Sequence, residues 1–309
     1  MKYYNDEAIQ SVYQMADAIE DIRAVLEDVR SQHIIMKERT VIEVPGTSDT
    51  MLYMPCINTR SMYSILKTIS IFPENSTQPV SQGVTLLSEL AHGAHVATLE
   101  SSYLTRLRTG AMSAVATDQL AASQAHVLGV IGTGGMAFEQ VLGVIAVRDI
   151  QTIKLYNRTT AKVHVFKTRL QTVTTAEIIV CQTAEEAVTG ADIINCATRS
   201  EEKVFSHDHL KRPVHINGVG SYLPTMHEID TETISQADCI VLDDIEGARH
   251  EAGEFIQAEQ DGSFAFSEAV PLSAISTLPQ QPRDITIFKS VGAAYYDLAV
   301  TIGAYHKLK

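Results

Sequence analysis

The clearest chemical signal in the sequence is a glycine-rich run at residues 132–137, which has the pattern G-x-G-x-x-A. This run directly follows an apolar strand pattern, Val127–Ile131, and directly precedes a helical pattern, Phe138–Val147. Glycines at a strand-to-helix turn let the backbone approach a pyrophosphate, and the amides and dipole of the helix start stabilise its charge. A glycine-rich turn without a ligand is the alternative. The predicted dinucleotide site consists of Gly132, Thr133, Gly134, Gly135, Met136 and Ala137.

The end of the next predicted strand bears on which nicotinamide dinucleotide binds. A site that prefers NAD usually has an Asp or Glu here, which accepts a hydrogen bond from the ribose 2′-hydroxyl. This chain has Asn157, Arg158 and Thr159 instead. Donors and one cation suit a 2′-phosphate, which a carboxylate would repel. We therefore expect NADP(H) to be preferred over NAD(H), with an exposed turn arginine as the alternative interpretation.

Three cations in the first half of the chain are candidates for binding a small acid, because a nucleotide site in the second half needs a substrate beside it. They are Arg39, Lys67 and Arg108. Lys67 lies in the apolar strand pattern Leu66–Ile69. A lysine there finds a partner or lines a cavity, since an unpaired buried ammonium is costly; a lysine that faces water from an edge strand is the other interpretation.

The remaining reactive side chains indicate no metal site. His92 and His95 are expected in a turn between two strands, and Asp243 with Asp244 in a solvated turn after a strand. The cysteines form no C-x-x-C pair, so they predict neither a disulfide frame nor a thiolate metal site. Buried thiols are expected at Cys56, Cys181, Cys196 and Cys239.

The first third of the chain has the pattern of an α+β unit. Apolar residues recur every three or four positions from Asn5 to Arg30, which predicts one amphipathic helix capped by Asn5. Short β-like runs follow and predict an antiparallel meander. These runs are Val41–Val44, Met51–Met54, Ser64–Phe72, Gly83–Glu89 and Ala94–Glu100.

Beyond an Ala-rich helical stretch at 110–122, strand and helix patterns alternate, which predicts an α/β fold with a doubly wound parallel sheet. The predicted strands are Val127–Ile131, Ile153–Tyr156, Glu177–Cys181, Ile193–Cys196, His215–Gly218 and Cys239–Leu242. A last strand, Ile285–Phe288, and an apolar helix, Ala293–Tyr305, close the chain.

The composition excludes several classes of protein. The chain has 309 residues, of which 45% are hydrophobic and 20% charged, typical of a globular protein with one or two domains. A formal net charge of −13 is the wrong sign for binding nucleic acid. No apolar run is long enough to span a membrane, and the first residues lack a hydrophobic signal core. We expect a cytoplasmic protein with no membrane partner.

Six segments, in matching order and spacing, resemble the ornithine cyclodeaminase/mu-crystallin family. They are Arg39 with Met54-Pro55, residues 67–75, 104–111 and 132–137, His215–Ser221, and Ile287–Gly292. The resemblance implies a Rossmann dinucleotide-binding domain at 119–288, inserted in an α+β substrate and dimerisation domain at 1–118 with 289–309. A homodimer is therefore expected. An antiparallel meander with one helix is also a small cover for so many apolar strand positions.

The resemblance also implies roles for individual residues. Arg39, Lys67 and Arg108 would hold a substrate carboxylate, and Gln82 would line the pocket. Catalytic roles fall to Lys67, Arg108 and Ser221, with the proton coming from Lys67 or from a water held by Ser221; the sequence leaves this choice open. Further cofactor contacts are implied at Ala197, Thr198, Val219, Ser290 and Gly292.

Two departures from the name-giving enzyme narrow the expected reaction. Ornithine cyclodeaminases have carboxylates where this chain has Leu52 and Tyr222. Without them a second, cationic amine has no partner. We expect an NAD(P)H-dependent reductase of a small cyclic imino acid, such as Δ1-pyrroline-2-carboxylate. The alternatives are an alanine dehydrogenase, a lyase resembling ornithine cyclodeaminase or hydroxyproline dehydratase, and a crystallin-like NADP-binding protein without turnover.

Overall fold

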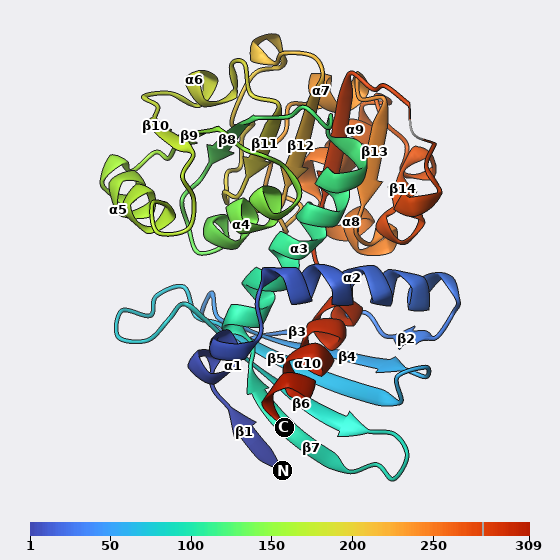
Figure 1. Ribbon diagram of the computed structural model, residues 1–309. Coiled ribbons are helices and arrows are strands. Elements are labelled where there is room, and N and C mark those ends of the chain that lie inside the picture. Colours follow the sequence, from blue (N-terminus) through green and yellow to red (C-terminus); the bar gives the residue numbers. More distant parts are fainter. Residues whose placement is uncertain (280) are drawn as a thin grey trace. The chain divides into compact units, whose positions relative to one another are not determined.

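The computed structural model describes residues 1–279 and 281–309, which form two compact units (Figure 1). Unit 1 comprises Met1–Arg108 and Ala293–Lys309, and unit 2 comprises Thr109–Gly292. The division after Arg108 comes ten residues before the predicted position, within helix α3 (Ser102–Leu120). In the described part of the chain, no helix combines the length and apolar character needed to cross a membrane.

Unit 1 is built on a seven-stranded sheet with the order β1-β7-β6-β5-β4-β2, and β3 also pairs with β4. The strands are β1 (Lys2–Tyr4), β2 (Ile34–Met36), β3 (Thr40–Glu43), β4 (Thr50–Asn58), β5 (Tyr63–Ile71), β6 (Ser81–Glu89) and β7 (His95–Glu100). The predicted meander is confirmed, because β4 to β7 pair antiparallel in sequence order. The short strands β1 and β2 were not predicted.

The N-terminal helix differs from the prediction, because it is two helices rather than one. Asn5 caps α1 (Asp6–Val12) as expected, accepting a hydrogen bond from the amide of Ala8 at 3.0 Å. Tyr13 is extended, and α2 (Met15–Arg30) begins after it. The Tyr13 side chain is fully buried and its hydroxyl donates to Asp21, so burial of this ring accompanies the break in the helical pattern.

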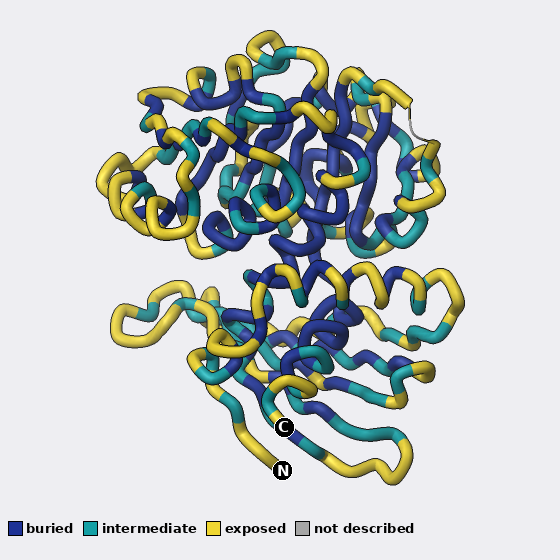
Figure 2. The backbone as a smooth tube through the Cα atoms, viewed as in Figure 1, coloured by how far each residue is buried: buried dark blue, intermediate teal, exposed yellow. Residues whose placement is uncertain are grey.

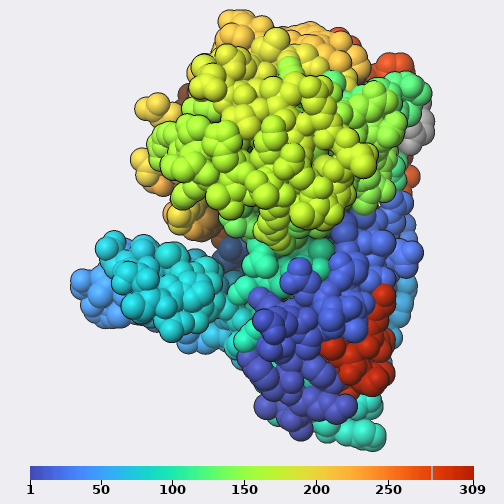
Figure 3. Space-filling view, turned by 60° about the vertical axis from the view of Figure 1, so that its left-hand side comes forward, coloured from blue at the N-terminus to red at the C-terminus, as the bar shows by residue number. Residues whose placement is uncertain are grey.

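One face of the unit 1 sheet packs against the C-terminal helix α10 (Ala294–Leu308), which contacts β4, β5 and β6 and lies against α2. Figure 3 shows this C-terminal segment in red against the N-terminal helices in blue. Side chains alternate between the faces of a strand. Met54, Lys67 and Thr85 are register partners in a buried row, whereas Leu66 is 40% exposed on the opposite face.

Unit 2 is a doubly wound parallel sheet, which confirms the predicted fold class. Its eight strands have the order β10-β9-β8-β11-β12-β15-β13-β14. They are β8 (Val127–Ile131), β9 (Thr152–Tyr156), β10 (Glu177–Val180), β11 (Ile193–Cys196), β12 (Val214–Gly218), β13 (Cys239–Leu242), β14 (Val270–Pro271) and β15 (Ile285–Lys289). In Figure 2 the central strands β11, β12, β15 and β13 are coloured as buried along their whole length, as expected for strands inside a parallel sheet that is covered on both faces.

Helices connect the strands of unit 2. They are α4 (Ala137–Val147), α5 (Thr160–Leu170), α6 (Ala184–Val188), α7 (Thr231–Ser235), α8 (Ile245–Glu251) and α9 (Gly253–Gln260), with short 3₁₀ turns at His207–His209, Phe266–Glu268 and Leu272–Thr277.

A buried polar network lies within unit 2. The ring nitrogens of His215 lie 2.9 Å from the Thr286 hydroxyl and 3.1 Å from Asn217 Oδ1. The Asn217 amide in turn donates to Thr117 and Asn195. Burial lowers the pKa of His215 to about 3, so the ring is neutral at physiological pH.

Candidate active site

The glycine-rich loop has the geometry that a pyrophosphate needs. Gly132 has a φ of +94°, and a Cβ on it would lie 2.6 Å from the carbonyl oxygen of Ala197. In contrast, a Cβ on Gly134 or Gly135 would meet nothing within 4 Å. Helix α4 begins directly afterwards, and its N-cap residue Met136 makes no side-chain capping bond. Open space in front of a helix start fits a dinucleotide phosphate.

In the loop after β9, one side chain binds the backbone and the next two are exposed to solvent. Asn157 Oδ1 accepts a hydrogen bond from the Thr133 amide at 3.2 Å, and its amide donates to the Thr159 carbonyl. Asn157 therefore organises the glycine-rich loop. Arg158 and Thr159 are exposed, and the first turn of α5 carries no acidic residue.

Ser221 lies in a buried polar cluster of unit 2. Its hydroxyl donates to both carboxylate oxygens of Glu254, at 2.9 and 3.0 Å. Lys289, at the end of β15, donates to the Ser221 carbonyl at 2.6 Å and pairs with Glu254 at 3.1 Å. All three residues are 1% exposed or less. The catalytic role implied for Ser221 stays a prediction, and the structure shows that its one hydroxyl proton already has an acceptor.

The expectation of a solvated turn at Asp243 is wrong. Asp243 is 1% exposed and accepts hydrogen bonds from the Ser290 hydroxyl and from the amides of Val291 and Gly292. A loop rich in amide donors therefore draws the carboxylate inward. Asp244 instead caps α8, accepting from the amide of Gly247.

A second buried cluster lies in unit 1 and contains two of the three predicted cations. Lys67 is 1% exposed; its ammonium donates to Asp297 Oδ1 at 2.7 Å and to the Thr105 hydroxyl at 2.6 Å. Arg108, one turn beyond Thr105 on α3, has its Nε 3.4 Å from the same Asp297 oxygen. Of the two interpretations of Lys67, the paired lysine is correct, since β5 is an internal strand.

Electrostatics within this cluster join Arg39 to the other groups. Burial lowers the pKa of Lys67; Asp297 opposes this shift, and Arg108 and Arg39 add to it. Burial alone would raise the pKa of Asp297, but Lys67, Arg108 and Arg39 together hold it below its usual value. Lys67 and Arg108 thus contact Asp297 directly, and Arg39 acts on the same carboxylate through its charge.

Leu52 and Gln82, two other positions singled out from the sequence, lie on opposite faces of the unit 1 sheet. Leu52 is 8% exposed and lies two residues before Met54 on the same buried face of β4. Gln82 is exposed, and strand alternation places it on the opposite face of the sheet from Lys67. Unit 1 therefore does not bring Gln82 together with the cationic cluster.

The remaining candidate groups are two histidines and four cysteines. Across the described residues no cluster of His, Cys, Asp and Glu is arranged to hold a metal ion. His92 lies in the predicted turn between two strands. The prediction is wrong for His95, which begins β7 and whose ring contacts the Ser88 hydroxyl. Buried free thiols are confirmed at Cys56, Cys181, Cys196 and Cys239.

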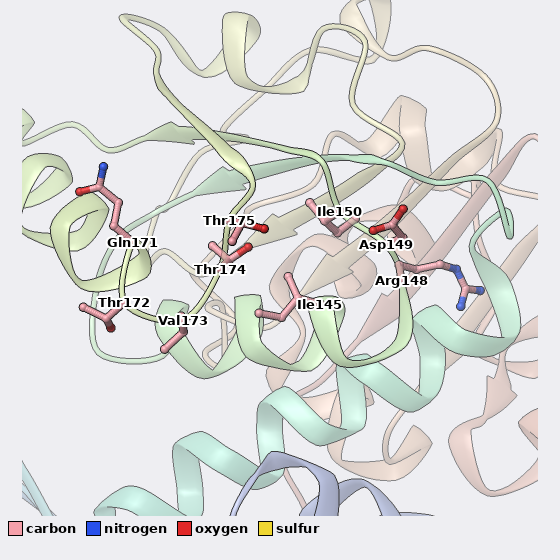
Figure 4. Close-up of a pocket in the computed structure, with 9 residues that line it drawn as sticks. All are labelled: Ile145, Arg148, Asp149, Ile150, Gln171, Thr172, Val173, Thr174 and Thr175. Atoms are coloured by element: carbon pink, nitrogen blue, oxygen red, sulfur yellow. The ribbon is translucent and has the colours of Figure 1, made fainter.

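A surface pocket of about 500 Å³ lies in unit 2, lined by Ile145, Arg148, Asp149, Ile150 and Gln171–Thr175 (Figure 4). It lies where β9 and β10 begin, whereas nucleotides bind beyond the carboxyl ends of such strands. The Arg148 guanidinium is also engaged, because it donates to carbonyls at the end of α3. This pocket is not the predicted site.

Three charged residues of these clusters were missed from the sequence: Glu254, Lys289 and Asp297. A signal existed for two of them. Asp297 stands in the apolar helix α10, and Lys289 ends the apolar strand β15. A charge in such a segment must be paired if it is buried.

A doubly wound sheet with a glycine-rich loop after its first strand defines unit 2 as a Rossmann-type dinucleotide-binding unit, and unit 1 adds a cluster suited to an anion. The chain belongs to the ornithine cyclodeaminase/mu-crystallin family, whose model matches residues 3–309.

Relatives of known activity are similar over almost the whole chain. A Δ1-pyrroline-2-carboxylate reductase from Bacillus cereus is 34% identical over 300 residues, covering 95% of this chain and 92% of the relative. The structure of a Thermococcus litoralis Δ1-pyrroline-2-carboxylate reductase, in complex with NADH and L-proline, is 29% identical. It superimposes with a TM-score of 0.94, over 99% of this chain and 97% of that one. An archaeal alanine dehydrogenase dimer with bound NAD is 26% identical, with a TM-score of 0.91, over 99% and 95% of the two chains.

Proposed function

We propose that this protein reduces Δ1-pyrroline-2-carboxylate to proline with a reduced nicotinamide dinucleotide. The observation that carries the proposal is the buried cluster of Lys67, Arg108 and Asp297. The apolar side chain of Leu52 lies on the same face of the sheet as Lys67. The reductases similar to this chain over nearly their full length support the same substrate.

The charges of the cluster suit one carboxylate. Lys67, Arg108 and Arg39 contribute three positive charges, and Asp297 contributes one negative charge. An excess of positive charge remains for a substrate anion, and arginine offers it a paired set of donors. Fixing the carboxylate orients the C=N carbon, and positioning of this kind supplies much of the rate of such reactions.

Lys67 is our proposed proton donor to the imine nitrogen. An ammonium has three protons, and Lys67 gives two of them to Thr105 and Asp297. Ser221 has one hydroxyl proton, which goes to Glu254. The lowered pKa of Lys67 also makes its ammonium a better acid. When bound, the reduced nicotinamide supplies the hydride.

Ornithine cyclisation is disfavoured by the same geometry. The distal ammonium of ornithine needs a carboxylate, and Leu52 offers it only an apolar surface. Burying that charge without a partner costs several kcal/mol. A ring without a distal charge fits better.

The finer choice of cofactor follows from the loop after β9. Asn157 is occupied with the backbone, so Arg158 and the Thr159 hydroxyl are the groups we assign to a 2′-phosphate. The absence of an acidic residue in the first turn of α5 favours the same ligand. We therefore propose a preference for NADPH over NADH.

A homodimer is proposed through the face of the unit 1 sheet opposite α10. Ile42, Leu66 and Val84 lie on this face and are 52%, 40% and 42% exposed. Exposed apolar side chains on one sheet face are typical of a protein interface, and a structure similar to this chain is a dimer. Sedimentation as a monomer at micromolar concentration would contradict the proposal.

The reaction is tested by a substrate screen with the purified chain. Absorbance of the reduced cofactor should fall with Δ1-pyrroline-2-carboxylate, and proline should accumulate. Δ1-piperideine-2-carboxylate and pyruvate with ammonia serve as competing substrates. Faster turnover with pyruvate and ammonia would make the protein an alanine dehydrogenase instead.

A further inference from the structure

Two buried carboxylates in unit 2 hold the loops at the carboxyl ends of β11, β12 and β15. Glu228 is fully buried. Its Oε1 accepts from the Thr198 amide at 2.6 Å and from the Thr198 hydroxyl at 2.8 Å. Its Oε2 accepts from the amides of Gly220 and Ser221, at 2.7 and 2.9 Å. One side chain thus fixes the loop after β11 to the loop after β12.

Asp243 does the same for the loop after β15. It accepts from the Ser290 hydroxyl and the Gly292 amide, both at 2.7 Å, and from the amide of Val291. The loops also approach each other closely. A Cβ on Gly220 would lie 2.1 Å from the carbonyl oxygen of Thr198, so even a methyl group would force these backbones apart.

The direction of these hydrogen bonds decides what the loops offer to a ligand. In a trans peptide the N–H and the preceding C=O point in opposite directions. Because the amides of Gly220 and Ser221 turn toward Glu228, the carbonyls before them, those of Val219 and Gly220, turn away from that carboxylate. Carbonyls that face away from the carboxylate can accept a hydrogen bond from a ligand. In contrast, the first amides of α4, which follow the open backbone at Gly134 and Gly135, can donate one.

This contrast matches the two ends of a nicotinamide dinucleotide. The pyrophosphate carries only acceptors and needs the donor-rich loop, while the nicotinamide carboxamide has an N–H₂ group that needs an acceptor. In a doubly wound sheet the strands on the two sides of the switch point bind the two nucleotide halves. Strands β11, β12 and β15 form the half that does not carry the glycine-rich loop.

We propose that Glu228 and Asp243 are positioning residues for the nicotinamide end of the cofactor, acting by turning the amides of three loops inward. The inference rests on the proposed function only in taking the ligand to be a nicotinamide dinucleotide. Lys289 and Glu254 brace the same region, since Lys289 binds the Ser221 carbonyl and Glu254 binds the Ser221 hydroxyl.

The test compares ligands with and without the nicotinamide. Calorimetry measures the Kd of NADPH, NADH, ADP-ribose and 2′-phospho-ADP-ribose for the full chain, for Glu228→Gln and for Asp243→Asn. Each substitution places an amide N–H₂ opposite N–H or O–H donors. We expect the Kd of the preferred reduced cofactor to rise about tenfold, the scale of a hydrogen bond to a charged group, and the Kd of the matching ADP-ribose to stay unchanged.

Asp238→Asn is the matched control. Asp238 accepts from the amides of Asp284 and Ile285, at 2.6 and 3.0 Å, at the opposite end of β15. This variant should bind every ligand as the parent chain does. Equal losses for the reduced cofactor and for ADP-ribose, or no loss for either, would overturn the proposal.

Milder variants cover the case in which the carboxylate variants fail to fold. Thr198→Val and Ser290→Ala each remove one hydroxyl bond to a carboxylate. In both variants the Kd of the reduced cofactor should rise, by less than in the carboxylate variants, and the Kd of the matching ADP-ribose should stay unchanged. If neither variant changes the Kd of the reduced cofactor, the proposal is overturned. If the parent binds NADPH but does not reduce Δ1-pyrroline-2-carboxylate, the proposed function fails and this inference still stands or falls on the binding data.

Discussion

Replacing Asp297 by Asn isolates the charge that holds the proposed proton donor. The ammonium of Lys67 lies 2.7 Å from Asp297, and both side chains are at most 3% exposed. At an effective dielectric constant of about 20, two unit charges at that separation attract by about 6 kcal/mol. A pKa unit corresponds to about 1.4 kcal/mol, so loss of even a quarter of this attraction lowers the pKa of Lys67 by about one unit.

The direction of the effect on activity follows from the role of the group. Lys67 donates a proton only while it is charged, so kcat/KM falls as the pH rises through its pKa. Asp297 raises that pKa against the effect of burial. In Asp297→Asn the alkaline limb of the pH profile should therefore move to lower pH by about one unit or more.

The assay is the pH dependence of kcat/KM for Δ1-pyrroline-2-carboxylate in both proteins. Ionisation of the imine itself is common to the two profiles and cancels in their difference. Asp21→Asn is a suitable control, because Asp21 is another partly buried carboxylate of unit 1 and accepts from Tyr13 at 2.5 Å. A profile that drops in height without moving along the pH axis would refute Lys67 as the donor.

Three further changes have defined outcomes. Arg108→Ala should lower kcat/KM by about 10² or more, since breaking a buried charge pair costs about 3–5 kcal/mol. Arg106→Ala, on the same helix, is the control. An unchanged kcat/KM in Arg108→Ala would show that Arg108 does not belong to the site. Arg158→Ala should weaken NADPH binding about tenfold and leave NADH nearly unchanged, and equal parent affinities for the two would contradict this. His215 binds a proton more weakly when folded, so stability should fall as the pH drops from 6.5 toward about 3, by up to about 4 kcal/mol. Urea unfolding at stepped pH should show a shallower loss in His215→Gln, and an identical slope would exclude His215 as the cause.

The sequence was sufficient to predict those strands and helices that are determined by short-range patterns of apolar residues. Strand and helix periodicity located the parallel sheet of unit 2 and the meander of unit 1 to within a few residues. The break at Tyr13 was not predicted, because the apolar period continues through it and only the burial of that ring in the folded unit distinguishes it. The strand β1 depends on pairing with β7, nearly a hundred residues away, which a three-residue segment cannot signal.

Site residues could likewise be predicted where the signal is local, but not where it depends on distant partners. Lys67 could be singled out because a charge in an apolar strand requires compensation. Its partner Asp297 is 230 residues away, and no local pattern joins the two. Glu228 and Asp243 lie outside regular strands and helices, where a carboxylate is ordinarily solvated, so their burial depends on amides that other loops bring to them.

The proposed reduction requires a hydride to pass from the nicotinamide to the C=N carbon of Δ1-pyrroline-2-carboxylate. The most direct measurement uses NADPH deuterated at C4 of the nicotinamide, on the face from which the enzyme takes the hydride, and examines the product by mass spectrometry. We expect proline that carries one deuterium at C2, and no release of ammonia from ornithine. Unlabelled proline, or ammonia release from ornithine at a comparable rate, would contradict the proposed reduction.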